Sequence, residues 1–486
     1  MRCLPLIFLC ISFVQPLSIV VYLSLVGKSH VDFVSALINI LVERGHEVDL
    51  LLARQNTLIT SNGTHKAKEV FAFSFPGASP WMDVDHLKAP FDVHAHKPYM
   101  FLEYVRIATQ LCRHGLASGE PARFLSKKKY DVGLTSDYDF CGYILFHQAG
   151  IKTVASFTAT NMFAHQAFSL GLPSPPSCVT VSSTYPCSQS LFFSEFLVQD
   201  SLIREFFGKG FPSAGELLRS SDLVFVNANE IIEKPRPLSH KVKYIGGIAL
   251  PKPKPLPNVP TANIPLHIRK ALVKAFVQFP DVTFFWNYKL QGDEGDMFTN
   301  AFNVKLMEWL PQSDLLNDPR VVGFISHMGL NSFLEASTAG VPIVAIPLFA
   351  DQTHNAHNAA YRGTTVIVKP EQLTTASMKR ALEKILYDPR YMENAKLISR
   401  MMKNKPEMGR DKFVEWIEFA AANKGLHKFL NLPGNDIGVM EYYCIDCVLL
   451  LLFAFFVVSL LAWKMTSMFV RIVRREDISS GKLKSN

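Results

Sequence analysis

A histidine, a glycine turn and the start of a helix lie close together in residues 325–335. His327 follows an apolar, strand-like run, Gly329 permits a tight turn, and a helical pattern begins near Asn331. The free N–H groups and the positive end of such a helix bind anions, and an imidazole can donate to a phosphate. Asn331 and Ser332 add donors on the first turn. The spacing therefore predicts a site for phosphate groups.

Residues on either side of this turn suit the remaining parts of a nucleotide sugar. Glu335 lies three residues after Ser332, on the same helix face, and can accept both hydroxyls of a ribose. Trp309 offers a flat face for a base, and the pair Asp351-Gln352 offers an acceptor and a donor for sugar hydroxyls. Taken singly, these residues could also be a core histidine, a packed indole and a helix cap. Taken together, they predict a nucleotide-sugar pocket.

A second candidate site lies near the start of the chain, at His30. The apolar run 19–26 predicts a strand, residues 27–30 a turn, and residues 48–52 the next strand. Between them one helix face carries Val34, Leu37, Ile38 and Leu41. The pattern is a β-α-β unit, and in parallel sheets the loop after the first strand commonly carries ligands.

The rest of the chain alternates strand-like and helix-like segments, which predicts an α/β fold with parallel sheets. In the first half we expect strands at 131–134, 152–156, 222–226 and 243–248, and a helix at 143–149. In the second half we expect strands at 282–288, 321–325, 342–346 and 364–368, and helices at 266–279, 332–339 and 375–387. The Phe-, Ser- and Pro-rich segment 158–215 shows little periodicity and could line an apolar pocket or simply fill a core.

These segments define a domain plan. Residues 249–260 contain five prolines, which predicts an extended linker. We therefore expect an N-terminal domain at 19–248, a linker at 249–265 and a C-terminal domain at 266–430. The net charge of +8 is spread along the chain, and no basic block indicates a nucleic-acid partner.

The two ends of the chain predict a membrane-anchored, secretory protein. Residues 1–18 have the basic start and short apolar core of a signal peptide. Residues 447–463 carry no charge and are long enough for a transmembrane helix, and residues 464–486 form a basic tail. Because basic residues stay cytoplasmic, we expect a type I protein with residues 19–446 in the lumen.

Cysteines and one sequon fit such a compartment. Cys178 and Cys187 flank a Pro/Ser-rich loop and could pair, because a lumenal setting permits disulfides. Cys444 and Cys447 form a CxxC next to the predicted span, without a second CxxC or a histidine cluster. We therefore favour a structural or unpaired role for them over zinc or redox chemistry. Asn62, in Asn-Gly-Thr, is the expected glycosylation site.

The stretch from Trp309 to Gln352 resembles the long signature of the UDP-glycosyltransferase family, in particular the animal UDP-glucuronosyltransferases, and its spacing fits over all 44 residues. The resemblance extends over nearly the whole chain. It implies a GT-B fold, in which two Rossmann-like domains face a cleft, with the acceptor in the first and the UDP-sugar in the second. It adds Gln312 and Gly329 to the UDP-sugar residues and implies that no metal or other cofactor is needed.

The resemblance also assigns a catalytic base. The family base is a histidine in the first strand–helix loop, which is the place of His30. It would take the proton from an acceptor hydroxyl, which then attacks the anomeric carbon and inverts it. The family's orienting carboxylate lies five residues beyond the aspartate that matches Asp131, where this chain has Ser136. We expect Asp137 to take that role, with Asp139 as the alternative.

Two further departures concern the donor half. The family usually has two glycines after the signature histidine, but here the first is Met328, whose side chain could crowd the diphosphate. In addition, the chain passes from the proline linker directly to the helix near Leu266. The opening strand of the second domain, with the family's Ser-Phe-Gly-Ser pattern, is missing. About thirty residues are absent relative to the family pattern, since a Rossmann-like half opens with a strand. A splice variant, a faulty gene model and real divergence are the alternatives for the cause.

The resulting prediction is a glycosyltransferase of the endoplasmic reticulum membrane that moves glucuronate or glucose from a UDP-sugar to a small lipophilic acceptor. Lys482 and Lys484 resemble the dilysine signal of that compartment. The alternative is a catalytically silent relative that binds hydrophobic ligands or pairs with active members, and both homo- and hetero-oligomers stay open. A dehydrogenase is disfavoured, because the loop 27–30 lacks a GxGxxG fingerprint.

Overall fold

The computed structural model describes residues 15–25, 27–55, 59–75, 91, 99–162, 164–172, 188–248, 264–290, 294–348, 350–407, 409–435, 439–442 and 444–482. Most of the predicted signal peptide, the loop with Cys178 and Cys187, and nearly all of the predicted linker lie outside the described residues. So do the last four residues, which include Lys484. The chain forms two units, residues 1–431 and residues 432–486.

The first half is built on a seven-stranded sheet in which all neighbouring strands are parallel. Its order is β3-β2-β1-β4-β5-β6-β7. The strands are β1 (Ser18–Leu25), β2 (Glu47–Arg54), β3 (Val70–Phe73), β4 (Val132–Ser136), β5 (Thr153–Thr158), β6 (Leu223–Val226) and β7 (Val242–Tyr244). Strand β1 pairs with both β2 and β4, so the loop after it opens near the middle of the sheet's carboxyl edge.

Helices cover this sheet, and the predicted amphipathic helix after β1 is confirmed. The helices are α1 (Lys28–Glu43), α3 (Tyr99–Ser118), α4 (Glu120–Leu125), α5 (Cys141–Gln148), α6 (Ala164–Ser169), α7 (Ser188–Phe207) and α8 (Ala214–Ser220). In α1 the residues Val34, Leu37, Ile38 and Leu41 are all buried. The segment 158–215, which lacks clear periodicity in the sequence, contains the 20-residue helix α7.

The strands of the second half form two separate sheets. A two-stranded sheet pairs β8 (Phe284–Asn287) with β9 (Val304–Met307), and a three-stranded sheet has the order β10-β11-β12. The latter strands are β10 (Phe324–Ser326), β11 (Ile343–Ala345) and β12 (Thr365–Ile367). Side chains of both sheets belong to one hydrophobic cluster, which includes Phe284, Val304, Ile325 and Val344. The two sheets therefore share a core.

Comparison with the sheet of the first half indicates which strand would join these two sheets. There β1 lies between β2 and β4, whereas among the described residues β8 has only β9 as a neighbour and β10 has only β11. A strand that precedes β8 as β1 precedes β2 would fit between β8 and β10. Residue Phe285 of β8 is 54% exposed, although strands buried on both faces are the rule in parallel sheets. The break lies at the place where the sequence analysis predicts a missing strand.

The helices of the second half follow the predicted rhythm, with α13 matching its expected bounds. They are α9 (Leu266–Phe276), α10 (Gln312–Asn317), α11 (Leu330–Ala339), α12 (Gln352–Tyr361), α13 (Thr375–Tyr387), α14 (Pro389–Lys403), α15 (Gly409–Ala422) and α16 (His427–Leu430). Short 3₁₀ turns lie at Glu294–Phe298, Pro370–Gln372 and Pro433–Asn435.

Helix α15 belongs to the core of the first half. Phe413 and Ile417 are buried with strands β1, β5 and β6, and the ring of Phe413 meets that of Phe225 at 4.9 Å. Arg410 pairs with Glu43 at the end of α1. The first half is therefore completed by residues that follow the second half in sequence.

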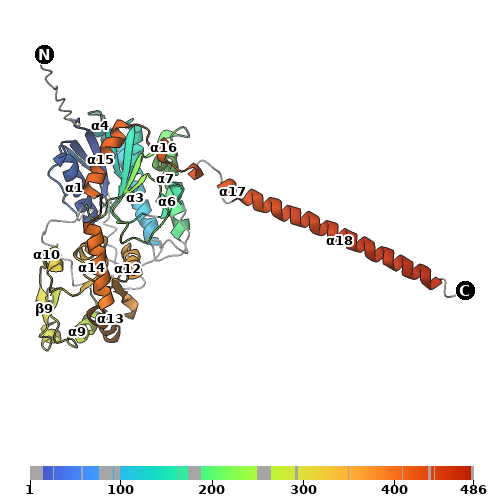
Figure 1. Ribbon diagram of the computed structural model, residues 1–486. Helices are drawn as coiled ribbons and strands as arrows, with labels where there is room; N and C mark the ends of the chain where they lie inside the picture. The colour runs from blue at the N-terminus through green and yellow to red at the C-terminus, as the bar shows by residue number, and fades with distance from the viewer. Residues whose placement is uncertain are drawn as a thin grey trace, which may run out of the picture. The chain divides into compact units, whose positions relative to one another are not determined.

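The second unit consists mainly of one long helix. After α17 (Val439–Tyr442), helix α18 runs unbroken from Ile445 to Lys482 (Figure 1). Its residues 445–472 are long and apolar enough to cross a membrane. The predicted span 447–463 lies inside this segment, and Cys444 and Cys447 beside its start are exposed and unpaired.

Candidate active site

His30 lies in the first turn of α1, directly beyond the carboxyl end of the central strand β1. Its Nδ1 is 3.4 Å from the hydroxyl of Ser29, whereas Nε2 is buried and has no hydrogen-bond partner among the described residues. The edge of the imidazole meets the ring of Tyr138, with centroids 4.4 Å apart. Burial lowers the pKa of His30 to about 4, so the ring is neutral at physiological pH. A neutral imidazole with an unused nitrogen can accept a proton.

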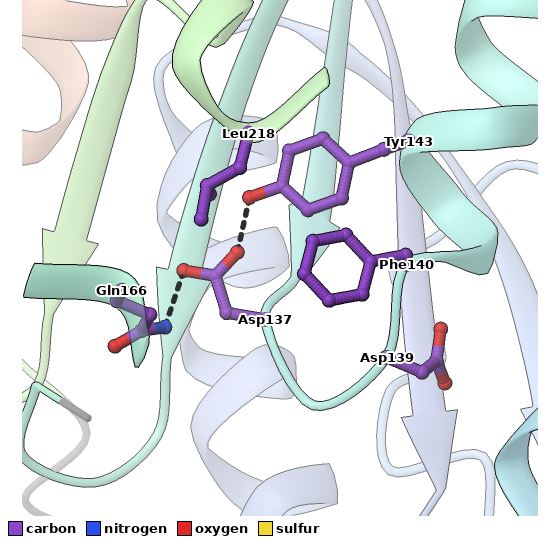
Figure 2. Close-up of a pocket in the computed structure, with 6 residues that line it drawn as sticks. All are labelled: Asp137, Asp139, Phe140, Tyr143, Gln166 and Leu218. Atoms are coloured by element: carbon purple, nitrogen blue, oxygen red, sulfur yellow. Dashed lines mark hydrogen bonds between the residues drawn. The ribbon is translucent and has the colours of Figure 1, made fainter. Parts of the chain in front are cut away.

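The expected pairing of His30 with Asp137 is not present in the structure. Asp137 accepts hydrogen bonds from the Tyr143 hydroxyl and, at 2.8 Å, from Gln166 Nε2 (Figure 2). The sequence suggested the pairing by nearness along the chain, but the loop after β4 turns this side chain into the layer between α5 and α6. Burial raises the pKa of Asp137 to about 7.

The alternative partner, Asp139, also makes its hydrogen bonds with residues other than His30. Its carboxylate accepts from the Tyr22 hydroxyl at 3.2 Å and from the backbone N–H of Cys141 at 2.9 Å, and Figure 2 shows it pointing away from Asp137. Ser136, at the family's carboxylate position, is buried and accepts a hydrogen bond from the Ser24 N–H at 3.3 Å. Among the described residues, then, an aromatic ring rather than a carboxylate contacts His30.

In the second half, the structure brings three predicted UDP-sugar residues together. Glu335 on α11 accepts hydrogen bonds from Gln312 Nε2 at 3.0 Å and from the Ser313 hydroxyl at 2.9 Å. Gln312 also contacts Ser332 at 3.3 Å. Two oxygen groups and an amide thus meet where α10 and α11 pack, which is a suitable donor and acceptor set for a ribose. Trp309, which precedes α10, is 40% exposed and leaves an indole face open.

The turn between β10 and α11 holds the predicted phosphate residues. A Cβ atom added to Gly329 would lie 2.6 Å from His327 Nε2, so the imidazole lies directly against this glycine. Burial lowers the pKa of His327. Asn331 and Ser332 lie in the first turn of α11, as expected. The turn thus presents an imidazole, a glycine and a helix start within a few residues.

Met328 has a left-handed backbone conformation. Its φ is 67°, a left-handed value that glycine adopts without strain. The side chain is fully buried in the cluster that contains Phe333 and Leu334. It therefore lies in the core, and the expected crowding of a diphosphate at the helix end is not observed.

Asp351 and Gln352, the predicted acceptor and donor for sugar hydroxyls, lie at the start of helix α12. Asp351 accepts a hydrogen bond from Asn355 Nδ2 at 2.8 Å, and burial raises its pKa. The side-chain oxygen of Gln352 accepts from the Leu348 N–H at 2.7 Å. Burial, with a smaller contribution from the charge of Asp351, raises the pKa of Tyr138, whose ring contacts His30. The candidate base and the candidate sugar residue thus approach one another through Tyr138, which the sequence did not single out.

The structure contains one disulfide bond among the described residues. Cys112 on α3 is bonded to Cys141 at the start of α5, a pairing that the sequence did not indicate. The suggested pair Cys178–Cys187 lies outside the described residues. Asn62 of the predicted sequon is half-buried, and its side-chain oxygen accepts from Arg54 at 2.5 Å.

Curated relatives of this chain are UDP-glucuronosyltransferases. UDP-glucuronosyltransferase 2B13 of Oryctolagus cuniculus is 26% identical over 470 residues, covering 86% of this chain and 87% of the relative. UDP-glucuronosyltransferase 2C1 of the same species is 28% identical, over 74% of this chain and 78% of its own length. For 2B13, 470 aligned positions use only 86% of the 486 residues here, so the relative carries internal residues that this chain lacks.

Solved structures with the same fold are glycosyltransferases. The calicheamicin glycosyltransferase CalG4 is 18% identical, with a TM-score of 0.58 over 84% of this chain and 99% of its own. The glycosyltransferase LpCGTa, solved in complex with UDP, has a TM-score of 0.55 at 14% identity over 84% of this chain and 99% of its own. The fold is therefore GT-B. The family model "UDP-glucoronosyl and UDP-glucosyl transferase" matches residues 20–264 and 259–477. The chain belongs to this family of UDP-glycosyltransferases.

Proposed function

We propose that the protein transfers a sugar, glucuronate or glucose, from a UDP-sugar to a hydroxyl of a small lipophilic acceptor. The observation that carries the proposal is the buried, unpartnered Nε2 of His30 among the described residues. A buried polar atom without a partner is costly, and such atoms are found where a substrate completes the hydrogen bond. An acceptor hydroxyl that donates to this nitrogen would complete it.

In the proposed reaction His30 takes the proton of that hydroxyl. The acceptor oxygen forms a bond to the anomeric carbon, and the bond from this carbon to the UDP oxygen breaks on the opposite face, which inverts the configuration. UDP leaves with its negative charge near His327 and the start of α11. Gln312, Glu335 and Trp309 hold the nucleoside, and Asp351 with Gln352 holds the sugar.

The aromatic character of the first half supports a lipophilic acceptor. The ring of His30 lies against the ring of Tyr138, with centroids 4.4 Å apart. A neutral base in such a setting favours an apolar substrate with one reactive hydroxyl. The test is formation of a labelled conjugate from UDP-[¹⁴C]glucuronate or UDP-[¹⁴C]glucose with mixed phenols and alcohols. Absence of any conjugate with both donors would contradict the proposal.

The second candidate is a catalytically silent relative that binds hydrophobic ligands or active partners. The specific observations in its favour are the break between β8 and β10 and the absence of a carboxylate contact to His30 among the described residues. In that case UDP or phenols would bind, but no sugar would be transferred. Calorimetric titration of the same preparation with UDP separates this outcome from a misfolded sample.

We further propose a type I orientation in the endoplasmic reticulum, with residues 19–446 in the lumen. The buried bond between Cys112 and Cys141 suits an oxidising compartment, and α18 suits the anchor. Protease added to intact microsomes should remove only the tail, and an endoglycosidase should remove a glycan from Asn62. A protected tail would contradict this orientation.

A further inference from the structure

One segment of the first half is embedded in the second. Residues 230–234 follow strand β6, and among them Ile232 is buried in the hydrophobic cluster of α11 and α12, with Phe333, Ala356 and Ala359. The neighbouring side chain, Glu233, is 6% exposed. An apolar anchor and a carboxylate from the acceptor half thus enter the donor half side by side.

Glu233 binds side chains from both halves. One carboxylate oxygen accepts from Asn161 Nδ2, in the loop that follows β5. The other lies 3.1 Å from His354 Nε2 and 2.8 Å from Asn358 Nδ2, both on α12. The backbone carbonyl of Glu233 accepts from Arg362 at the end of α12, at 2.5 Å. The carboxylate therefore joins a loop of the acceptor half to two successive turns of one donor-half helix.

A carboxylate in this position makes a strong and specific connection. The carboxylate oxygens are hydrogen-bond acceptors, and Asn161, His354 and Asn358 each present a nitrogen to them. A buried charge is tolerated only when its hydrogen bonds are complete, and its removal leaves the donors of Asn161, His354 and Asn358 without their acceptor. Replacement of the Glu233 carboxylate therefore removes several hydrogen bonds that join the two halves.

Both ends of this connection lead to the candidate active site. Helix α12 begins directly after Asp351, and Asn355 on the same helix donates to Asp351. At the other end, Asn161 adjoins Thr160, whose hydroxyl lies 3.0 Å from that of Tyr138. The ring of Tyr138 contacts His30.

We propose that Glu233 is a positioning residue, which holds the sugar-binding start of α12 in register with the loop that supports His30. The proposal rests on the proposed function. It assigns Glu233 no contact with substrate: it acts through α12 and the loop at Asn161. Because transfer needs the hydroxyl and the anomeric carbon in a near-attack geometry, a small shift between the halves lowers the rate of transfer more than it lowers the affinity for UDP.

The test compares Glu233→Gln with Glu230→Gln in the full chain, in detergent or microsomes. Glu230 is three residues away, and its carboxylate pairs only with Lys405 on the surface among the described residues. For Glu233→Gln we expect kcat to fall about ten- to hundredfold, the loss that follows a misplacement of about 1 Å. The Kd for UDP, measured by calorimetry, should stay within about twofold of the control, the scatter of independent sites.

Two results would overturn the proposal. If Glu233→Gln turns over like Glu230→Gln, the connection does not position the reacting groups. If UDP affinity falls in parallel with kcat, Glu233 merely stabilises the donor half. Should Glu233→Gln fail to fold, Asn161→Ala provides the same comparison, because it leaves Glu233 bound to His354 and Asn358. It should show the same loss of kcat with UDP binding retained, and wild-type turnover in that variant would equally overturn the proposal.

Hydrogen exchange separates a failure of this inference from a failure of the proposed function. If the wild-type protein transfers no sugar at all, the proposed function fails, but the connection can still be measured. Glu233→Gln should then speed amide exchange in α12 (Gln352–Tyr361) and around Thr160, relative to Glu230→Gln. Unchanged exchange in both segments would overturn the proposed connection itself.

Discussion

The imidazole of His30 meets the ring of Tyr138 edge to face, at an interplanar angle of 76°. The contact fixes the plane of the imidazole without taking either of its nitrogens. Tyr138 is itself held by Thr160, at 3.0 Å, and its backbone carbonyl accepts from Tyr104. Among the described residues, an aromatic ring and no carboxylate thus orients the imidazole. Because no negative charge beside it stabilises the protonated ring, we expect the pKa of His30 to stay low.

Replacement of His30 by alanine should abolish transfer. Loss of a general base lowers kcat by about 10²–10⁴, whereas the residues that we propose to bind UDP lie on the other half and should keep their affinity. Turnover of UDP-sugar and calorimetric titration with UDP measure the two effects. His65→Ala, at an exposed position, is the control. Retention of more than half of the activity would remove His30 from the reaction.

The pH profile should differ from that of a base paired with a carboxylate. Since burial lowers the pKa of His30 to about 4, kcat/KM should rise with pH through about 4 and stay level above it. In Ser136→Asp a negative charge near the end of β4 should raise this pKa and move the acid limb to higher pH. Ser136→Asn controls for shape. Superimposable profiles for the two variants would show that residue 136 does not act on His30.

Glu335→Ala should weaken UDP binding by about 1–3 kcal/mol, the usual effect of leaving buried hydrogen-bonding groups unpaired. Glu335 also holds Gln312 and Ser313, so the ribose site loses its organising acceptor. Calorimetry with UDP measures the change, and Glu383→Ala is the matched control, at a half-exposed side chain of α13. Equal affinity of the two variants would exclude Glu335 from the site.

Met328→Gly tests two opposing effects of comparable size. Glycine would relieve a left-handed backbone strain of about 1–2 kcal/mol. It would also remove a fully buried methionine side chain, and such losses cost about 2–5 kcal/mol. We therefore expect a net loss of up to about 4 kcal/mol, seen as a lower midpoint of thermal unfolding. A raised midpoint would show that the strain outweighs the packing.

The broken sheet should make the donor half less stable than the acceptor half. Strands β8 and β10 each have one paired edge among the described residues, whereas β1 and β4 have two. Unpaired backbone groups that stay buried cost about 1–3 kcal/mol each, and domains are stable by only about 5–15 kcal/mol. In native-state hydrogen exchange, amides of β8 and β10 should therefore exchange faster than those of β1 and β4. If the amides of β8 and β10 exchanged as slowly as those of β1 and β4, the break would not destabilise the donor half.

Much of the fold could be predicted because hydrophobic periodicity was clear where elements are long. The helix at 375–387 and the strand–helix unit around His30 are examples. Strand β9 was not predicted, because Lys305 interrupts a four-residue apolar run that is too short to show a period. Helix α7 was not predicted, because the adjoining Pro- and Ser-rich residues hide its pattern.

The candidate site could be predicted only where it is local in sequence. Gln312, Ser332 and Glu335 belong to one motif, and the structure brings them together. The surroundings of His30 depend on contacts between distant segments, so nearness in sequence suggested Asp137 where the fold supplies Tyr138. The bond between Cys112 and Cys141 escaped prediction for the same reason, because pairing depends on where α3 and α5 pack.

The return of α15 to the first core has a consequence for synthesis of the chain. The acceptor half needs Phe413 and Ile417, which follow the whole donor half, so it cannot close when Ile248 leaves the ribosome. From Ile248 to Ala422 the chain is 174 residues long, and at about 5–20 residues per second this delay is roughly 9–35 s. Throughout that interval the apolar face that α15 will cover, including Phe225 and Ile245, stays open. The nascent protein therefore presents an apolar binding surface to chaperones until α15 has been made.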